Sequence, residues 1–336
     1  MKEFHVCGLG NAIVDIFLEL SDAEFAALEF ERGTMRLVEA DEQRQLLARF
    51  AEREPRLVSG GSVANSIIGL AQLGGKAAFI GCVGDDRYGL FYESEFEELG
   101  IEIGAPVIVE ETTGTCVCII TPDAERTMRT CLAVSGHLAD RHIDEARIKA
   151  SEWLFVEGYL FANPNGQGAI RESIRLAKKH GTKVAVTCSE AFVVDVFGDA
   201  FREALGQTDL LFCNQSEACA VAQTKNAQGA FAKLKGLAPS CVVTDGPNGA
   251  YVRHAGAETH VPAFPCEPKD LTGAGDMFAG AFLYGITHGV APAQAARAAC
   301  YLAMKVITQI GARLHHGTRQ SWELAMAEAE IPNSNN

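Results

Sequence analysis

A short run of small residues, 273–275, stands directly before Asp276 and an apolar segment that begins at Met277. The apolar segment predicts a buried helix, so Gly273, Ala274 and Gly275 would direct backbone N–H groups and the helix dipole toward one spot. Asp276 would lie in the first helical turn, beside that spot. Phosphoryl transfer to a hydroxyl needs such an anion hole next to a carboxylate that accepts the hydroxyl proton. A plain glycine-rich turn with an acid at the helix start fits this segment equally well.

Asp15 is a second carboxylate with a chemical use. It follows an apolar strand and lies between Val14 and Ile16, where an unpaired buried carboxylate would be costly. Two vicinal hydroxyls would satisfy it, as in the recognition of a ribose. The alternative is an acid on the solvent side of the same strand.

The elements that must position these residues alternate from about residue 150 onward. Strands separated by helices indicate βαβ units, a parallel sheet and right-handed crossovers. The segments with strand character are 153–156, 183–187, 209–213 and 241–244, and those with helix character are 167–180, 227–235, 273–288 and 292–310.

The first third of the chain has a different pattern. A strand at 4–9, a helix at 63–73 and a strand at 77–83 fit the same core, whereas 13–20, 35–38, 106–109 and 115–121 alternate like half-exposed antiparallel strands. These excursions predict a small accessory sheet that serves as a lid beside a ligand cleft. We therefore expect an α/β core from residues 1–12, 40–104 and 134–330, a lid from 13–39 and 105–133, and a tail at 331–336.

The composition is that of a globular chain with a large core: 336 residues, 48% apolar and 21% charged. A net charge of −14 argues against a nucleic-acid surface, and no segment has the pattern of a signal peptide or a membrane span. We expect a cytoplasmic protein without nucleic-acid or membrane partners, either a monomer or a homodimer.

Eleven cysteines without a C-x-x-C pair indicate reduced, packed thiols. Cys116 and Cys118 are two residues apart and share one face of an expected strand. For the cysteines, packing is favoured over metal ligation or a catalytic thiol.

Several motifs occur in one order along the chain. One set is at 60–65, 81–89, 214–217, 244–249 and 270–276, and a second set is at 10–15, 33–40, 125–128 and 157–159. The first set resembles the signatures of the ribokinase-like, or PfkB, carbohydrate kinase family, and the second resembles its adenosine kinase-like branch.

The resemblance implies a three-layer αβα sandwich with a mainly parallel central sheet and a small β-sheet lid. It also implies transfer of the γ-phosphate of ATP, with Mg²⁺, to a primary hydroxyl. Asp276 would be the base and residues 273–275 the anion hole. Arg126 would approach the transferred phosphate when the lid closes, with an exposed loop arginine as the alternative.

The resemblance also implies a set of acceptor-binding residues. Asp15, Asn65 and the backbone of Gly60 and Gly61 would bind the sugar. The aromatic candidates for stacking on a base are Tyr159 and Phe17, with packing in the core as the alternative for both.

For the cofactor, the resemblance implies that Asn214 and Glu217 organise the waters around Mg²⁺, which seldom has an all-protein cage. An N-cap Asn with Glu three residues later is also a capping box. The turn with Thr244, Gly246 and Gly249 would bind the nucleotide. Some family members use K⁺ near the loop that holds Asp270 and Thr272, and the sequence leaves this open.

The chain departs from the family's usual pattern at Leu271, where Thr is common, and at 188–192, where the branch more often has Ser-Asp-Pro-Phe. These departures put the acceptor in doubt rather than the reaction. The prediction is an ATP-dependent kinase for the 5′-hydroxyl of a nucleoside, first of all adenosine. The alternatives are a kinase of ribose, fructose or a ketodeoxy sugar acid, and a catalytically silent nucleotide-binding regulator.

Overall fold

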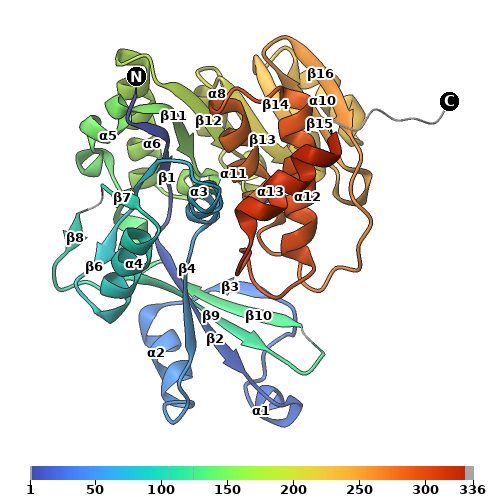
Figure 1. Cartoon of the computed structure of the whole chain (residues 1–336). Helices are drawn as coiled ribbons and strands as arrows, with labels where there is room; N and C mark the ends of the chain where they lie inside the picture. Colours follow the sequence, from blue (N-terminus) through green and yellow to red (C-terminus); the bar gives the residue numbers. More distant parts are fainter. Residues whose placement is uncertain (1, 105, 124, 330–336) are drawn as a thin grey trace.

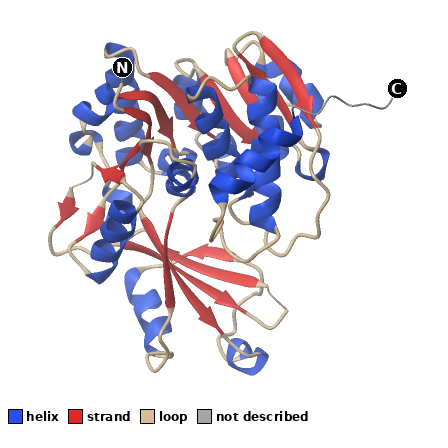
Figure 2. Cartoon of the chain, in the orientation of Figure 1, coloured by secondary structure: helices blue, strands red, loops and turns tan. Residues whose placement is uncertain are grey.

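A computed structural model describes residues 2–104, 106–123 and 125–329. The tail expected at 331–336 lies outside these residues. Within them, the chain forms a large sheet with helices on both sides and a smaller sheet at one end (Figure 1, Figure 2). None of the described helices combines the length and hydrophobicity that a membrane crossing requires.

The large sheet has nine strands in the order β16-β15-β14-β13-β12-β11-β1-β5-β7. The strands from β14 to β7 pair in parallel, and β15 and β16 are added antiparallel at one edge. The prediction of a mainly parallel central sheet is thus confirmed. The strands are β1 Phe4–Leu9, β5 Ala77–Ile80, β7 Ile101–Ile103, β11 Ser151–Val156, β12 Lys183–Thr187, β13 Leu210–Asn214, β14 Ser240–Thr244, β15 Ala250–His254 and β16 Ala257–Val261.

The inner strands of the large sheet are buried on both faces, and their successive side chains enter opposite hydrophobic layers, whereas the edge strand β16 is mostly exposed. In β13, Leu210 and Phe212 belong to one layer and Leu211 and Cys213 to the other. The first layer is covered by α3 Ser62–Gln72, α4 Arg87–Glu98, α11 Ala274–Thr287, α12 Pro292–Ile307 and α13 Thr318–Ala329. The second is covered by α5 Glu145–Ala150, α6 Pro164–Lys179, α7 Ala191–Val196, α8 Gly198–Leu205, α9 Gln215–Ala222 and α10 Ala227–Leu234. This is the expected three-layer αβα sandwich.

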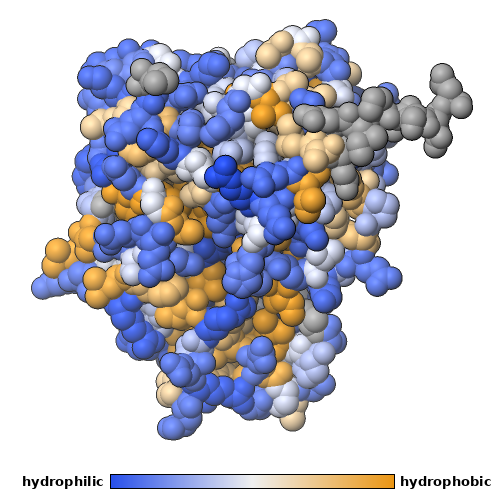
Figure 3. Space-filling model, viewed as in Figure 1, coloured by the Kyte–Doolittle hydropathy of each residue, from blue (hydrophilic) through white to orange (hydrophobic). Residues whose placement is uncertain are grey.

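The smaller sheet, called the lid below, has five strands in the order β3-β10-β9-β2-β4. They are β3 Met35–Leu37, β10 Arg126–Cys131, β9 Gly114–Ile120, β2 Ile13–Glu19 and β4 Arg56–Gly60. Its outer face packs on the short helices α1 Asp22–Ala26 and α2 Ala40–Ala48. On the face shown in Figure 3, apolar side chains gather where the lid meets the core.

The lid differs from the sequence expectation in three respects. It is not purely antiparallel, because β2 pairs in parallel with β9 and β3 with β10. Core elements lie between β2 and β9 in the chain. Because no hairpin turn connects these two strands, they need not pair antiparallel. The expected strand at 106–109 is β8 Val107–Ile108, which pairs with β6 Val83–Gly84 outside the lid. Finally, β4 and α2 belong to the lid, although residues 40–104 were expected in the core.

Apart from this difference, the division of the chain into domains stays a prediction.

Two helices of the first layer, α3 and α11, pack so closely that a side chain is excluded between them. A Cβ atom on Gly280 in α11 would lie 2.2 Å from the carbonyl oxygen of Ser66 in α3. Because that neighbour is backbone, it cannot turn aside. The close approach fixes the position of the N-terminus of α11 relative to that of α3.

We expect Gly280→Ala to lower the free energy of unfolding by about 1–3 kcal/mol, the usual cost of overpacking. The matched control is Gly168→Ala in α6, where an added Cβ meets nothing within 4 Å. That change should be neutral or stabilise by about 0.5–1 kcal/mol. Urea denaturation measures both, and equal stability of the two variants would contradict the close packing of α3 on α11.

Candidate active site

The loop before α11 has the backbone shape that the sequence predicts. Gly273 is the N-cap of α11, with φ +79°, in the left-handed region that favours glycine. A Cβ there would lie 2.2 Å from the carbonyl oxygen of Ala312, so a side chain is excluded for a second reason. The free N–H groups of the first turn follow directly, and Asp276 lies within that turn.

Two side chains from the start of α3 hold the carboxylate of Asp276. Ser62 Oγ donates to Asp276 Oδ1 at 2.7 Å, and Asn65 Nδ2 donates to Oδ2 at 3.1 Å. The N-termini of α3 and α11 therefore meet at this acid. Asn65, predicted as a sugar ligand, contacts the proposed base directly.

Burial raises the pKa of Asp276 to about 6, and the hydrogen bonds from Ser62 and Asn65 oppose that rise. Near neutral pH the group is therefore mostly ionised but more basic than an ordinary aspartate. A carboxylate in this state can accept a proton from a hydroxyl that is losing it.

A cavity of about 350 Å³ opens beside Asp276 at the carboxyl ends of β12, β13 and β14. This end of a parallel sheet is where ligands usually bind in α/β folds. Of the predicted site residues, the cavity is lined by Asp276, Gly273, Gly275, Asn214, Glu217, Thr244 and Tyr159. Ser62 and Leu271 also line it.

Asn214 and Glu217 form the capping box that was the alternative interpretation. Asn214 Nδ2 donates to Glu217 Oε1 at 2.6 Å, the Asn214 backbone N–H donates to Oε2 at 2.9 Å, and the Glu217 N–H donates to Asn214 Oδ1 at 3.0 Å. Burial raises the pKa of Glu217 to about 7. The pair lines the cavity as well, so capping does not exclude the predicted role at Mg²⁺.

Only the first of the residues predicted in the turn at the end of β14 lies at the cavity. Thr244 lines the cavity, whereas Gly246 and Gly249 are not among its lining residues. Gly249 has φ +93°, and a Cβ there would lie 1.9 Å from the carbonyl oxygen of Val261. Close packing against β16 therefore accounts for this glycine without a nucleotide.

Asp15 lies on β2, and Gly60, at the end of the adjacent strand β4, leaves space for its side chain. A Cβ on Gly60 would lie 2.9 Å from Asp15 Oδ2. Gly61 has φ +106° and is the N-cap of α3. The structure thus brings Asp15, Gly60 and Gly61 together at the point where the lid joins α3.

Burial raises the pKa of Asp15 to about 6, while Arg313, Arg126 and Arg56 oppose the rise. The negative charge of Asp276 acts in the same direction as burial. The two carboxylates are therefore close enough to interact electrostatically across the junction of lid and core.

Arg126 links the lid to the loop before α11. Its guanidinium forms an ion pair with Asp270 at 2.7 Å and donates from Nη1 to Thr272 Oγ1 at 3.4 Å. The side chain is only 11% exposed. In this structure Arg126 is therefore not the exposed loop arginine of the alternative interpretation.

The two aromatic candidates lie in different places. Tyr159 lines the cavity in the core, with its ring centroid 6.4 Å from that of Phe192. Phe17 belongs to the inner face of the lid, where the guanidinium of Arg126 lies 5.3 Å from its ring centroid. The structure does not bring Tyr159 and Phe17 together on one surface.

Glu157 lies within the motif at 157–159, but its residue type alone predicted no role for it. Glu157 is 1% exposed and accepts hydrogen bonds from Asn11 Nδ2 at 2.6 Å and from the Val63 backbone N–H at 3.1 Å. Burial raises the pKa of this carboxyl group to about 7. Glu157 directly follows the buried strand β11, at the carboxyl end of the sheet where ligands usually bind. This position was the sequence feature that could have indicated a role at the site. Ser62 lies within the motif at 60–65, and the sequence likewise predicted no role for it.

Arg313 is a second residue that sequence reasoning missed. It donates to Glu95 Oε1 at 3.2 Å and to the backbone carbonyl of Ser59 in β4. These contacts connect the segment after α12 with both α4 and the lid. An isolated arginine outside any motif gave no signal of this.

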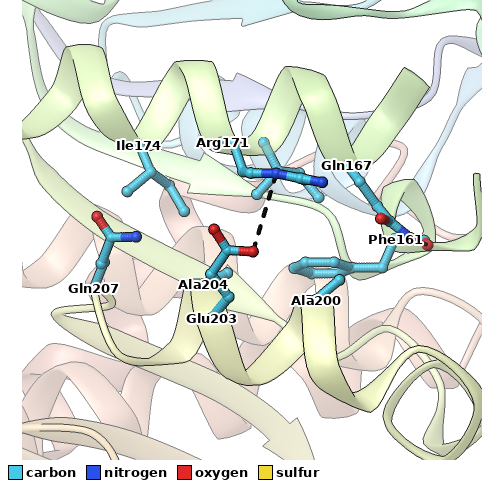
Figure 4. A pocket seen from close by; sticks show the side chains of 9 residues that line it. Phe161, Gln167, Arg171, Ile174, Ala200, Glu203, Ala204 and Gln207 are labelled. Atoms are coloured by element: carbon cyan, nitrogen blue, oxygen red, sulfur yellow. Dashed lines mark hydrogen bonds and ion pairs between the residues drawn. The ribbon is translucent and has the colours of Figure 1, made fainter. Parts of the chain in front are cut away.

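A groove between α6 and α8 is shown in Figure 4, and its volume is only about 10 Å³, room for roughly one water. Arg171 and Glu203 face each other across it at 4.0 Å. It offers no space for a substrate, so the cavity beside Asp276 is the better candidate site.

Residues 34–318 match the family described as "pfkB family carbohydrate kinase". The chain is 26% identical to the adenosine kinase of Saccharomyces cerevisiae, over 84% of this chain and 88% of that protein. Two solved structures are each 30% identical to it. One is a probable sugar kinase protein from Rhizobium etli (TM-score 0.87, covering 97% of this chain and 99% of that one). The other is the adenosine kinase of Sinorhizobium meliloti (TM-score 0.86, covering 96% and 99%). The chain belongs to the pfkB family of carbohydrate kinases, which are ATP-using phosphotransferases with an alcohol group as acceptor.

Proposed function

We propose that this kinase transfers the γ-phosphate of ATP to the 5′-hydroxyl of a nucleoside, most of all adenosine. The observation that carries the proposal is Asp276 held by Ser62 and Asn65 beside the N-terminus of α11. Asp276 accepts the hydroxyl proton, and the N–H groups at residues 273–275 hold the negative charge of the transferred group.

Asp15 positions the acceptor by accepting hydrogen bonds from two vicinal ribose hydroxyls. Gly60 and Gly61 let the ribose approach the backbone at the start of α3, since neither carries a side chain. Asp15 and Asp276 lie on opposite sides of the junction between lid and core, so the sugar spans the distance between them. Arg126, which already touches the loop before α11, approaches the phosphate from the lid.

The inner face of the lid supports a nucleoside rather than a free sugar. Beside Asp15 this face is apolar, with Ile13, Phe17 and Met128 packed together. Apolar and aromatic surface suits a flat base, whereas a free sugar requires a further ring of polar groups. Tyr159 adds a separate aromatic surface in the core cavity. The sugar kinase alternative is kept because the likeness to the Rhizobium etli protein is as strong as that to an adenosine kinase.

Asn214 and Glu217 offer amide and carboxylate oxygens at the cavity, a donor set that fits a hydrated Mg²⁺. When bound there, the ion neutralises charge on the phosphates of ATP. Thr244, Gly246 and Gly249 are proposed to bind the nucleotide. Asp270, beside the loop where some relatives hold K⁺, pairs with Arg126 here, so K⁺ is not part of the proposal.

We expect Asp276→Asn to lower kcat by about 10²- to 10⁴-fold, the usual contribution of a positioned general base. The amide keeps the shape of the side chain but accepts no proton. The dissociation constant for MgATP, measured by calorimetry, should stay within about threefold of wild type. Retention of most of the rate would exclude Asp276 as the base.

A stability measurement separates this loss from misfolding. The pKa of Asp276 is raised from 3.8 to about 6 in the folded protein, so the folded state binds more protons between those pH values. Its ionisation therefore costs stability as the pH rises through that window. The free energy of unfolding of Asp276→Asn, relative to wild type, should be higher at pH 8 than at pH 4. A constant difference would contradict the raised pKa.

The acceptor is tested by combining Asp15→Asn with adenosine and 2′-deoxyadenosine. Loss of a hydrogen bond to a charged group costs about 1.5–3 kcal/mol, so KM for adenosine should rise about 10- to 150-fold. KM for ATP should not change. Wild type should prefer adenosine to 2′-deoxyadenosine, and the variant should lose that preference because an amide replaces the carboxylate that accepts hydrogen bonds from the diol. An unchanged preference would remove Asp15 from the ribose site, and faster turnover of ribose or fructose by wild type would favour the sugar kinase.

A further inference from the structure

Two thiols and a carboxylate converge on the inner face of the lid. Cys116 and Cys118 lie on the same face of β9, with their Sγ atoms 3.6 Å apart. Asp15 is the register partner of Cys116 on the adjacent strand β2. One carboxylate oxygen of Asp15 and both sulfurs all lie within 4.8 Å of one another.

These distances fit the coordination shell of a tetrahedral ion that prefers sulfur. Two sulfurs bound to zinc at about 2.3 Å would be about 3.8 Å apart, and a sulfur and a carboxylate oxygen about 3.6 Å apart. The observed sulfur separation of 3.6 Å is close to the first value. Only small side-chain movements would therefore bring all three ligands onto one ion, with the fourth position left for water.

The neighbouring arginines partly offset the charge of a bound complex, although the contact with Cys116, burial and the charge of Asp15 raise the pKa of the Cys118 thiol. Two thiolates and a carboxylate around a divalent cation carry a net charge of −1. Arg313, Arg126 and Arg56 all act electrostatically on Asp15, and Arg126 also acts on Cys118. Their positive charges would stabilise an anionic complex, against the opposing negative charge of Asp276.

A hydrogen bond outside the ligand set supports one of the sulfurs. Thr130 Oγ1 donates to Cys116 Sγ at 3.2 Å from the neighbouring strand β10. Such donors orient metal ligands in proteins. On binding, each thiol releases its proton to solvent and forms a metal–sulfur bond without any change of oxidation state.

We propose that Cys116, Cys118 and Asp15 form a binding site for a thiophilic divalent cation, Zn²⁺ or Cd²⁺, and that the bound cation blocks the acceptor. The block rests on the proposed function, because it requires Asp15 to be an acceptor ligand. Cation binding itself does not. Mg²⁺ does not compete for this site, since it prefers oxygen ligands and octahedral geometry.

The test is a Cd²⁺ titration of the full chain, followed by the ultraviolet charge-transfer absorption of cadmium thiolates. Wild type should bind one equivalent more than the double variant Cys116→Ser/Cys118→Ser. The control is Cys131→Ser, which removes a buried thiol of the adjacent lid strand β10 and should bind as wild type does. Equal binding by wild type and the double variant would overturn the site.

A second variant, Asp15→Asn, keeps both thiols and tests the third ligand. Its affinity for Cd²⁺ should fall by at least about tenfold, since loss of even an outer partner of a metal ligand costs about 10- to 100-fold. Unchanged affinity would remove Asp15 from the ligand set. Because this experiment reads absorption only, it gives an answer even if the chain does not phosphorylate nucleosides.

Kinetics test the block. At saturating MgATP, Zn²⁺ should raise the apparent KM for adenosine without lowering kcat, and a zinc-selective chelator should reverse the effect. Cys118→Ser, active without Zn²⁺, should resist the inhibition. Cation binding together with inhibition that is not competitive with adenosine would contradict the block and leave the binding site standing. If the serine variants do not fold, competition between Cd²⁺ and adenosine on wild type decides the same question.

Discussion

The contact between the N-termini of α3 and α11 is the interaction on which the site depends. Ser62 and Asn65 reach Asp276 only because α11 approaches α3 closely enough for Gly280 to face a backbone carbonyl of α3. The same approach places the start of α3 beside the first turn of α11, which carries both Asp276 and the free N–H groups. A packing constraint between two helices thus determines how Ser62 and Asn65 meet Asp276, the proposed proton acceptor.

The lid completes the site from the other side. Its strands β2 and β4 lead directly into and out of core elements, so Asp15 and Gly60 are fixed where the two sheets meet. Arg126 extends from β10 to Asp270 and Thr272, which gives the lid a direct contact with the loop before α11. Burial raises the pKa of both Asp15 and Asp276, as expected for groups enclosed between two layers.

The sequence could predict those features that depend on residues close together in the chain. The glycines at 273 and 275 and the acid at 276 act within one turn, so their spacing allowed an anion site at a helix start, with a plain glycine-rich turn as the equal alternative. The alternation of strands and helices after residue 150 likewise predicted a parallel sheet. The capping box of Asn214 and Glu217 is equally local, and both of its interpretations could be foreseen.

The contacts that join distant segments could not be predicted in this way. Core elements separate β2 from β9 along the chain, so no turn joins these two strands directly. No turn residues in the sequence could therefore predict their parallel pairing. Glu157 meets Val63 across 94 residues, and Arg313 meets Ser59 across 254. Such contacts form only in the packed fold. A single sequence therefore identifies the residue but does not predict which distant residue it contacts.

The pKa of Asp276 in the folded protein tests the central claim most directly. Carbon-13 NMR of aspartate carboxyl groups, with Asp276→Asn for assignment, measures it without any substrate. The account predicts a pKa of about 6 in wild type and a higher value in Ser62→Ala, because the lost hydrogen bond stabilised the ionised form. An ordinary value near 3.8 in both proteins would contradict it, since Asp276 would then be neither buried between α3 and α11 nor held by Ser62.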